Sequence, residues 1–290
     1  MKKILVTGVN SYIGNSFRDY MKNFSDEYSV DGISCRGDAW KDCDFSAYDC
    51  VFHVAGIAHT APGKITDEQR SLYYSVNCDL TAEVAEKAKK SGVGQFIFMS
   101  SAIVYGEYYP IGKPKRITRD TEPEPSGAYG DSKLQAEKKL HRLEDENFRV
   151  VILRPPMIYG KNSKGNYPIL SKLAQKLPVF PKVDNSRSML YVGNLVEFVR
   201  LMIKNNESGT FFPQNGEYSN TSELVRTVAK VHGKNIILVP GTEWALRLLA
   251  AFTPLPSKAF GSITYDMSMS EYSENYRLYS LEQSVRLTEG

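Results

Sequence analysis

The feature that most constrains the fold is an alternation of short apolar runs with amphipathic patterns along the first half of the 290-residue chain. The apolar runs are strand-sized and rich in β-branched residues, as in a sheet that is covered on both faces. They lie at Ile4–Val6, Ser29–Ser34, Val51–Val54, Phe96–Met99 and Val150–Leu153. Because helical patterns separate them, the sequence predicts an α/β fold with a doubly wound parallel sheet.

The clearest helical pattern runs from about Glu68 to Lys90, and Gly92 follows it as a stop signal. Apolar residues recur there at every fourth position, at Leu72, Val76, Leu80, Val84 and Ala88. After Arg154, proline and glycine become frequent, which predicts a smaller α/β region of shorter elements. Its expected helices are Tyr167–Gln175, Asn194–Lys204, Ser222–Val231 and Glu243–Ala251, and its expected strands lie near Thr210–Phe212 and Ile236–Val239. From about Ser268 no period is convincing.

Composition excludes several classes of partner. Lys and Arg number 36 against 33 Asp and Glu, and this net charge of +3 is too small for a nucleic-acid-binding stripe. The apolar runs fall far short of the roughly 20 residues that span a bilayer, so no membrane partner is expected. Ile4–Val6 is too short for a signal-peptide core, which predicts a cytoplasmic protein. The four cysteines and four histidines lack metal-ligand spacing, so no metal site is expected.

A tight glycine turn joins the first strand to the first helix, in Thr7-Gly8-Val9-Asn10-Ser11-Tyr12-Ile13-Gly14. Such a turn lets backbone amides approach a pyrophosphate at the positive end of the helix dipole. The strand before it and the helix after it make dinucleotide binding, and hence a Rossmann sheet, the favoured interpretation. The expected binding residues are Gly8, Asn10, Ser11, Tyr12, Ile13 and Gly14.

The end of the second strand selects between NAD and NADP. An acidic residue there holds the adenosine ribose of NAD, whereas an arginine accommodates the 2′-phosphate of NADP. The residues at that corner are Ser34, Cys35 and Arg36, which mildly favours NADP with Ser34 and Arg36 as contacts. A shift of register would bring in Asp31, Asp38 lies in the following loop, and Arg36 is equally well explained as a solvated charge.

Catalytic side chains are expected at the carboxyl edge of the sheet. Tyr129 and Lys133 lie one helical turn apart, and a lysine ammonium and a nicotinamide cation would together favour the phenolate of a tyrosine. Such a pair can move a proton while a cofactor moves a hydride. Ser100 and Ser101 end the fourth strand, and the small residues Val54, Ala55 and Gly56 after the third would let a cofactor come close.

These segments resemble the extended short-chain dehydrogenase/reductase family over about residues 1–195, including its T-G-x-x-G-x-x-G turn. Ser11 departs from that turn, since it replaces the middle glycine. The resemblance implies that Tyr129 is the catalytic base or acid, that Lys133 lowers its pKa and holds the nicotinamide ribose, and that Ser101 binds the reacting oxygen. Ser100 is the lesser alternative. Asn77 matches a family asparagine near the cofactor, and His53 is interpreted as structural.

The same resemblance assigns a nucleotide-sugar substrate. Arg187, in Arg-Ser-Met-Leu-Tyr-Val, lies where the family grips a sugar-nucleotide diphosphate, and Asn166 lies where a helix start contacts it. It therefore implies an NAD(P)-binding domain over 1–160, to which a strand and helix near 183–204 return, and a mostly substrate-binding region over 161–290. A homodimer through the helices near Glu68–Lys90 and Tyr129–Glu146 follows by analogy.

Three functions remain open. The 4,6-dehydratases of the family have Asp-Glu directly after the catalytic hydroxyl, and Ala102-Ile103 stands there instead. Chemistry at C4 alone remains, and likeness to capsule-cluster proteins narrowly favours a UDP-hexose 4-epimerase of the UDP-glucose or UDP-GlcNAc type. An NADPH-dependent reductase of a 4-keto sugar is the alternative, and a non-catalytic NADP sensor is a remote third.

Overall fold

The computed structural model describes residues 1–58, 65–106 and 109–290. The chain divides into two compact units. Unit 1 comprises Met1–Glu107, Glu122–Pro155 and Val196–Phe212, and unit 2 comprises Tyr108–Thr121, Pro156–Leu195 and Pro213–Gly290. Residues 108–121 thus belong to unit 2, although they fall inside the range expected for the first domain.

Unit 1 is built on a six-stranded sheet in which all neighbouring strands are parallel, in the order β10-β6-β4-β3-β1-β2. The strands are β1 (Lys2–Thr7), β2 (Tyr28–Ile33), β3 (Cys50–His53), β4 (Gln95–Met99), β6 (Arg149–Leu153) and β10 (Gly209–Phe211). The doubly wound sheet predicted from the sequence is confirmed. Because β1 pairs with β2 on one side and β3 on the other, the strand order reverses beside β1, and in such sheets ligands bind there, beyond the strands' carboxyl ends.

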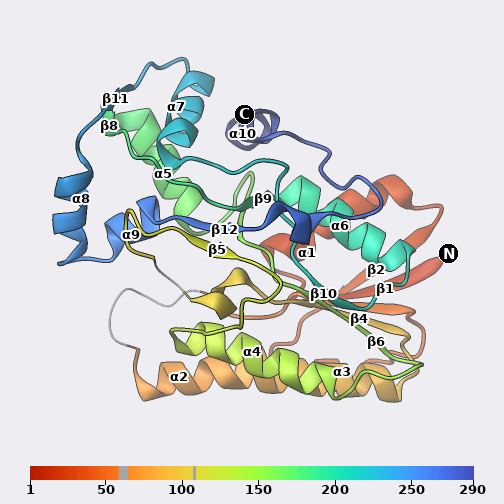
Figure 1. Ribbon diagram of the computed structural model, residues 1–290. Helices are drawn as coiled ribbons and strands as arrows, with labels where there is room; N and C mark the ends of the chain where they lie inside the picture. The colour runs from red at the N-terminus through yellow and green to blue at the C-terminus, as the bar shows by residue number, and fades with distance from the viewer. Residues whose placement is uncertain (59–64, 107–108) are drawn as a thin grey trace. The chain divides into compact units, whose positions relative to one another are not determined.

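Helices cover both faces of this sheet (Figure 1). α2, α3 and α4 lie on one face, and α1 and α6 on the other. Their bounds are α1 (Tyr12–Met21), α2 (Asp67–Tyr74), α3 (Leu80–Lys90), α4 (Ala128–His141) and α6 (Val192–Lys204), with single turns η1 (Lys22–Phe24), η2 (Ala39–Asp42) and η4 (Ala102–Tyr105). Alternate strand residues such as Phe96, Phe98, Val150 and Ile152 pack with Ala88 and Leu140 of the helices, as the period of two requires.

The helix predicted over Glu68–Lys90 is interrupted by a π-helical segment, η3 (Ser75–Asp79). The predicted apolar face is wrong in its first half, because Leu72 is exposed and Tyr73 and Asn77 are buried instead. A repeat of four residues exceeds the 3.6 residues of an α-helical turn, and a π-segment absorbs the surplus residue.

Unit 2 holds three short parallel strand pairs and five helices among its described residues. The strands are β5 (Lys115–Ile117) with β12 (Ile263–Tyr265), β7 (Met157–Tyr159) with β9 (Met189–Tyr191), and β8 (Val179–Pro181) with β11 (Ile237–Val239). The helices are α5 (Asn166–Lys176), α7 (Thr221–Val231), α8 (Glu243–Ala250), α9 (Leu255–Phe260) and α10 (Leu281–Glu289), and η5 (Met267–Ser270) is a single turn. A separate core packs α5 and α7 through Leu170, Leu224 and Val228.

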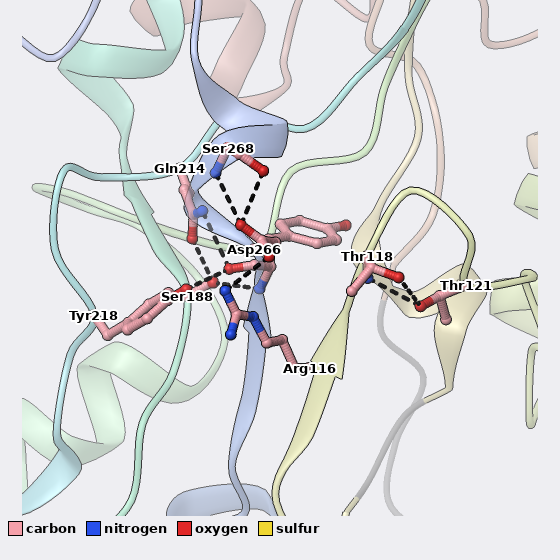
Figure 2. A network of polar contacts seen from close by, with 9 residues as sticks. Arg116, Thr118, Thr121, Ser188, Gln214, Tyr218, Asp266 and Ser268 are labelled. Atoms are coloured by element: carbon pink, nitrogen blue, oxygen red, sulfur yellow. Dashed lines mark hydrogen bonds and ion pairs between the residues drawn. The ribbon is translucent and has the colours of Figure 1, made fainter.

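A polar network fixes the excursion of residues 109–121 to the rest of unit 2 (Figure 2). Arg116 on β5 points at Asp266, with 2.7 Å between the guanidinium nitrogen Nη2 and the carboxylate oxygen Oδ2. Next to it, Ser188 accepts a hydrogen bond of 2.8 Å from the amide of Tyr265 and donates to Gln214. The contacts join segments far apart in sequence, and no pattern within residues 109–121 indicates them. The first domain was expected over 1–160 with a strand and helix near 183–204, whereas only Val196–Phe212 returns to unit 1.

Over the stretches that the structure describes, we find no helix with both the length and the apolar character needed to cross a membrane.

Candidate active site

The turn after β1 brings the backbone of two strands into close contact. Gly8 has a φ of +83°, and a Cβ on it would lie 2.8 Å from the amide nitrogen of Ala55. Its own amide donates to the carbonyl of Ile33, 2.9 Å away. Only glycine tolerates both conditions, and the tight turn expected between the first strand and the first helix is therefore fixed against the ends of β2 and β3.

Ser11 explains how the turn works without the family's middle glycine. It is the N-cap of α1, and its hydroxyl oxygen accepts a hydrogen bond of 2.9 Å from the amide of Gly14. A Cβ on Gly14 would meet that same oxygen at 2.7 Å, so position 14 requires a glycine as long as Ser11 caps the helix. The helix start is therefore stabilised by a side chain. The amides of the first turn point out of the helix, where a pyrophosphate fits.

The corner after β2 is open at the residues expected to meet the adenosine ribose. Ser34 is half-buried, Arg36 is exposed, and the amide of Arg36 donates to the hydroxyl of Ser34 at 3.3 Å. Asp31 accepts a hydrogen bond of 3.0 Å from Tyr48, and Asp38 pairs with Lys41 at 2.9 Å. Both carboxylates therefore have protein partners of their own. Arg36, which is exposed just after β2, is the charged residue better placed to meet a ligand at this corner.

Tyr129 and Ser101 meet at the carboxyl edge of the sheet. α4 begins at Ala128, which places Tyr129 in its first turn, and Ser101 lies two residues after the end of β4, as the N-cap of η4. Burial raises the pKa of Tyr129 to about 12, although a hydrogen bond with the Ser101 side chain lowers it. The protein itself therefore keeps this phenol protonated at neutral pH, and its ring lies 5.8 Å from that of Tyr73.

Ser100 is committed to a different, structural network. Its buried hydroxyl donates to the carboxylate of Glu137, which also accepts from the Arg154 guanidinium at 3.1, 3.2 and 2.6 Å. Arg154 donates in turn to the hydroxyl of Tyr105 at 2.7 Å. Burial lowers the pKa of Arg154, but the hydrogen bonds and charge of Glu137, together with Tyr105, more than offset this and raise it. Of the two serines, Ser101 is thus the one beside Tyr129.

Lys133 and Asn77 converge on the segment after β3. The Lys133 ammonium donates to the carbonyl of Met99 at 2.9 Å, and a Cβ on Gly56 would lie 3.3 Å from it. Burial lowers the pKa of Lys133 to about 8, against a smaller opposing effect of Glu137. Asn77 accepts from the amide of Ile57 at 2.9 Å and donates to its carbonyl at 3.0 Å. Asn77 is fully buried and so holds this loop in place.

His53 connects these parts through a network that sequence reasoning did not anticipate. Its ring lies between Thr7, 2.8 Å from Nδ1, and Thr81, 3.1 Å from Nε2. Because Thr81 donates its only hydroxyl proton to the carbonyl of Asn77, Nε2 of His53 must carry the proton. Burial lowers the pKa of His53 to about 3, so it is neutral and links the glycine turn to the π-segment. In the sequence this network is visible only as a histidine at a strand end and two distant threonines. Because their spacing follows no rule, sequence reasoning could not connect them.

The two residues expected to bind substrate lie in unit 2. Arg187 donates from Nη1 to the carbonyls of Lys258 and Ala259, the latter at 3.1 Å, near the end of α9. Burial lowers the pKa of Arg187 to about 10, and its Nε has no hydrogen-bond partner. Asn166 opens α5 after Gly165, which has a φ of 97°.

A comparison with protein-family models identifies the family of the chain. The model of the NAD dependent epimerase/dehydratase family matches residues 4–212. The chain belongs to this family. It is therefore an NAD-dependent enzyme of the epimerase/dehydratase class, which confirms the expected enzyme class and a nicotinamide cofactor.

Relatives and solved structures of this epimerase/dehydratase family agree with that assignment. A UDP-glucose 4-epimerase of Vibrio cholerae is 31% identical over 92% of this chain and 88% of the relative. An N-acetyl-α-D-glucosaminyl-diphospho-ditrans,octacis-undecaprenol 4-epimerase of Escherichia coli O157:H7 is 37% identical over 48% of this chain and 42% of that protein. A UDP-glucuronic acid 4-epimerase of Bacillus cereus in complex with NAD has a TM-score of 0.73 at 20% identity, covering 99% of this chain and 95% of that chain. RMD of Pseudomonas aeruginosa complexed with NADPH has a TM-score of 0.77 at 17% identity, covering 99% and 98%. At these identities the structures establish the fold alone.

Proposed function

We propose that this protein is a UDP-hexose 4-epimerase of the UDP-glucose or UDP-GlcNAc type that acts in surface polysaccharide synthesis. The pairing of Tyr129 with Ser101 at the carboxyl edge of the sheet supports C4 chemistry. The likeness to a UDP-glucose 4-epimerase along 92% of the chain supports the substrate. Ala102 and Ile103 form the start of η4 beside Ser101 and offer no acid or base for dehydration.

The residues of unit 1 fit a dinucleotide. Gly8 and Ala55 approach so closely that a single added carbon would fill the space between them, which is the cradle a pyrophosphate needs. The amides of Asn10, Tyr12 and Ile13 would hold the phosphates, since the amides of Ser11 and Gly14 donate to the carbonyl of Gly8 and to the Ser11 hydroxyl. Ser34 and Arg36 would hold the adenosine ribose, and Val54 to Gly56 with Lys133 the nicotinamide half. A nicotinamide bound there would supply reversible hydride transfer at C4 of the sugar, with return of the hydride to the other face of the ring.

The protein's own part is to move a proton at the C4 oxygen. Ser101 would donate a hydrogen bond to that oxygen. The charges of Lys133 and of a bound nicotinamide would favour the phenolate of Tyr129, which is protonated in the protein alone. Tyr129 would then take the proton of the C4 hydroxyl as C4 is oxidised and give it back as C4 is reduced. Lys133, which is held by the carbonyl of Met99, places a positive charge near the loop at Gly56. In unit 2, Arg187 and Asn166 would bind the diphosphate of the nucleotide.

A reductase of 4-keto sugars is the second candidate, and one observation favours it. The pKa of Tyr129 is raised to about 12, so the phenol holds a proton ready for a 4-keto oxygen. Arg36 at the end of β2 is also suited to the 2′-phosphate of NADPH.

One assay separates the two. Purified protein is incubated with UDP-GlcNAc or UDP-glucose and the products are read by NMR. An epimerase produces the C4 epimer with no net use of cofactor, whereas a reductase oxidises NADPH only when a 4-keto sugar is added. If neither UDP-sugar yields an epimer, the epimerase proposal fails.

Two serine variants and one tyrosine variant test the assigned roles. Tyr129→Phe is expected to lower kcat by a factor of about a thousand, because only the proton path is lost, while cofactor affinity stays unchanged. Ser101→Ala is expected to lower kcat about a hundredfold. Ser100→Ala is the matched control: it leaves kcat within about threefold but destabilises the fold by about 1–3 kcal/mol, because Glu137 loses a buried donor. Full activity in Tyr129→Phe would refute the assignment.

A further inference from the structure

α8 and the residues that follow it expose an unusual number of large apolar side chains on unit 2. Phe252 is 82% exposed, Trp244 71% and Leu255 65%. α8, which the structure describes over its whole length, has no buried residue. Together with Leu248, these residues form what we call the apolar patch. A patch of this kind on a soluble fold marks an interaction surface.

Exposed apolar side chains also occur on the strand pair of β8 and β11. β11 pairs in parallel with β8, and Ile237 lies opposite Val179. Ile237, Val179 and Leu177 are 66%, 47% and 40% exposed. α8 stands at the left edge of Figure 1 with β8 and β11 above it. Unit 2 therefore exposes apolar side chains on two elements besides the turn between α8 and α9.

Few charged side chains lie within the apolar patch, and the charged side chains of the nearby stretches are basic. Residues 237–255 contain only Glu243 and Arg247 as charged side chains, and these pair with each other at 3.2 Å. Outside that stretch, residues 171–182, 230–236 and 256–258 contain no acidic residue, and their charged side chains are Lys172, Lys176, Lys182, Lys230, Lys234 and Lys258. The chain as a whole is almost balanced, with 36 basic and 33 acidic residues, so this excess is local.

We propose that the apolar patch docks on the surface of an anionic membrane. Exposed Trp, Phe and Leu enter the boundary between headgroups and acyl chains, while a rim of lysines pairs with anionic headgroups. A second copy of the chain suits this surface less well, because a symmetric contact would bring two basic rims face to face. The sequence predicted no membrane partner from the lack of a spanning segment, but surface docking requires no such segment.

The proposal goes beyond the reaction at C4 and is tested without any activity measurement. The chain has two tryptophans, of which Trp40 is 2% exposed and Trp244 71%, so a change in emission reports on Trp244. Adding vesicles of phosphatidylglycerol should shift the emission to the blue and carry the protein into the pellet on centrifugation. Vesicles of phosphatidylcholine should do so at least about tenfold less well, and added salt should weaken binding to phosphatidylglycerol.

Matched variants locate the contact. The double variant Phe252→Ser, Leu255→Ser should weaken binding at least about tenfold, since each side chain contributes by its own apolar burial. Leu278→Ser, Leu287→Ser removes two apolar side chains that are 43% and 49% exposed elsewhere in unit 2, and should bind as the unchanged protein does. Circular dichroism confirms that both variants fold. The proposal is overturned if no vesicle shifts the emission, if Phe252→Ser, Leu255→Ser binds normally, or if that variant only dissociates a dimer that ignores vesicles.

Discussion

At the scale of single residues, the sequence identified side-chain chemistry better than it identified surroundings. Tyr129 and Ser101 were expected to act together, and the structure brings them together. The raised pKa of Tyr129 was not foreseen, because a sequence shows the spacing of Tyr129 and Lys133 but not their burial. The structure attributes the lowering effect on Tyr129 to Ser101, and burial outweighs it.

His53 gives a prediction for stability against pH. Its pKa is lowered from 6.5 to about 3, so the unfolded chain binds a proton between these values that the folded chain does not. Stability contributed by neutral His53 is therefore fully present above about pH 6.5 and falls as the pH drops toward 3, by about 1.4 kcal/mol per pH unit. His53→Gln should be less stable at neutral pH and show a shallower decline over this range.

Urea unfolding of both proteins at a series of pH values measures the difference. All carboxylates titrate in both proteins, so only the difference between the two curves belongs to His53. Parallel curves from pH 6.5 to 3 would show that the histidine is charged in the folded state, against its position between Thr7 and Thr81.

At the scale of elements, patterns within one helix or strand were more informative than pairings between distant segments. The strands of the main sheet and the helices α5, α6 and α7 follow the patterns in the sequence. Strands of three residues such as β5 and β12 were missed, because no period shows in three residues and their pairing joins segments far apart. α10 was also missed, although the Ser280 and Gln283 capping box marked its start.

Ser11 allows a test of how the glycine turn is stabilised. Ser11→Ala removes the acceptor for the Gly14 amide and should lower the free energy of unfolding by about 1 kcal/mol, whereas Ser11→Gly should cost only a few tenths, about 0.3 kcal/mol. Cofactor affinity, measured by calorimetry, should survive better in Ser11→Gly, which restores the family's own glycine. Equal losses in both variants would mean that the cap contributes nothing here.

The junction of α4 with β4 and β6 depends on one buried ion pair. Glu137 is 1% exposed and its carboxylate faces Arg154 and Ser100. Glu137→Ala leaves the guanidinium without its counter-charge and should destabilise unit 1 by about 3–5 kcal/mol in denaturant unfolding. A double variant with Arg154→Leu should recover part of this loss, because the uncompensated charge is gone. Failure to recover would point to packing instead of charge as the cause.

At the scale of the whole molecule, ligand binding and folding are linked, which gives a direct measure of cofactor choice. A dinucleotide that binds only the folded chain adds about 2.7 kcal/mol of stability at a hundredfold excess over its Kd. If Arg36 contacts the 2′-phosphate, NADP should raise the melting temperature more than NAD does at equal concentration. Arg36→Ala should then remove the extra shift with NADP and leave the NAD shift unchanged, because the exposed side chain has no part in the pyrophosphate turn. A larger shift with NAD in the unchanged protein would instead make Arg36 a solvated charge. That outcome would weaken the reductase alternative and leave the epimerase proposal intact, since epimerisation returns the hydride and needs no pool of reduced cofactor.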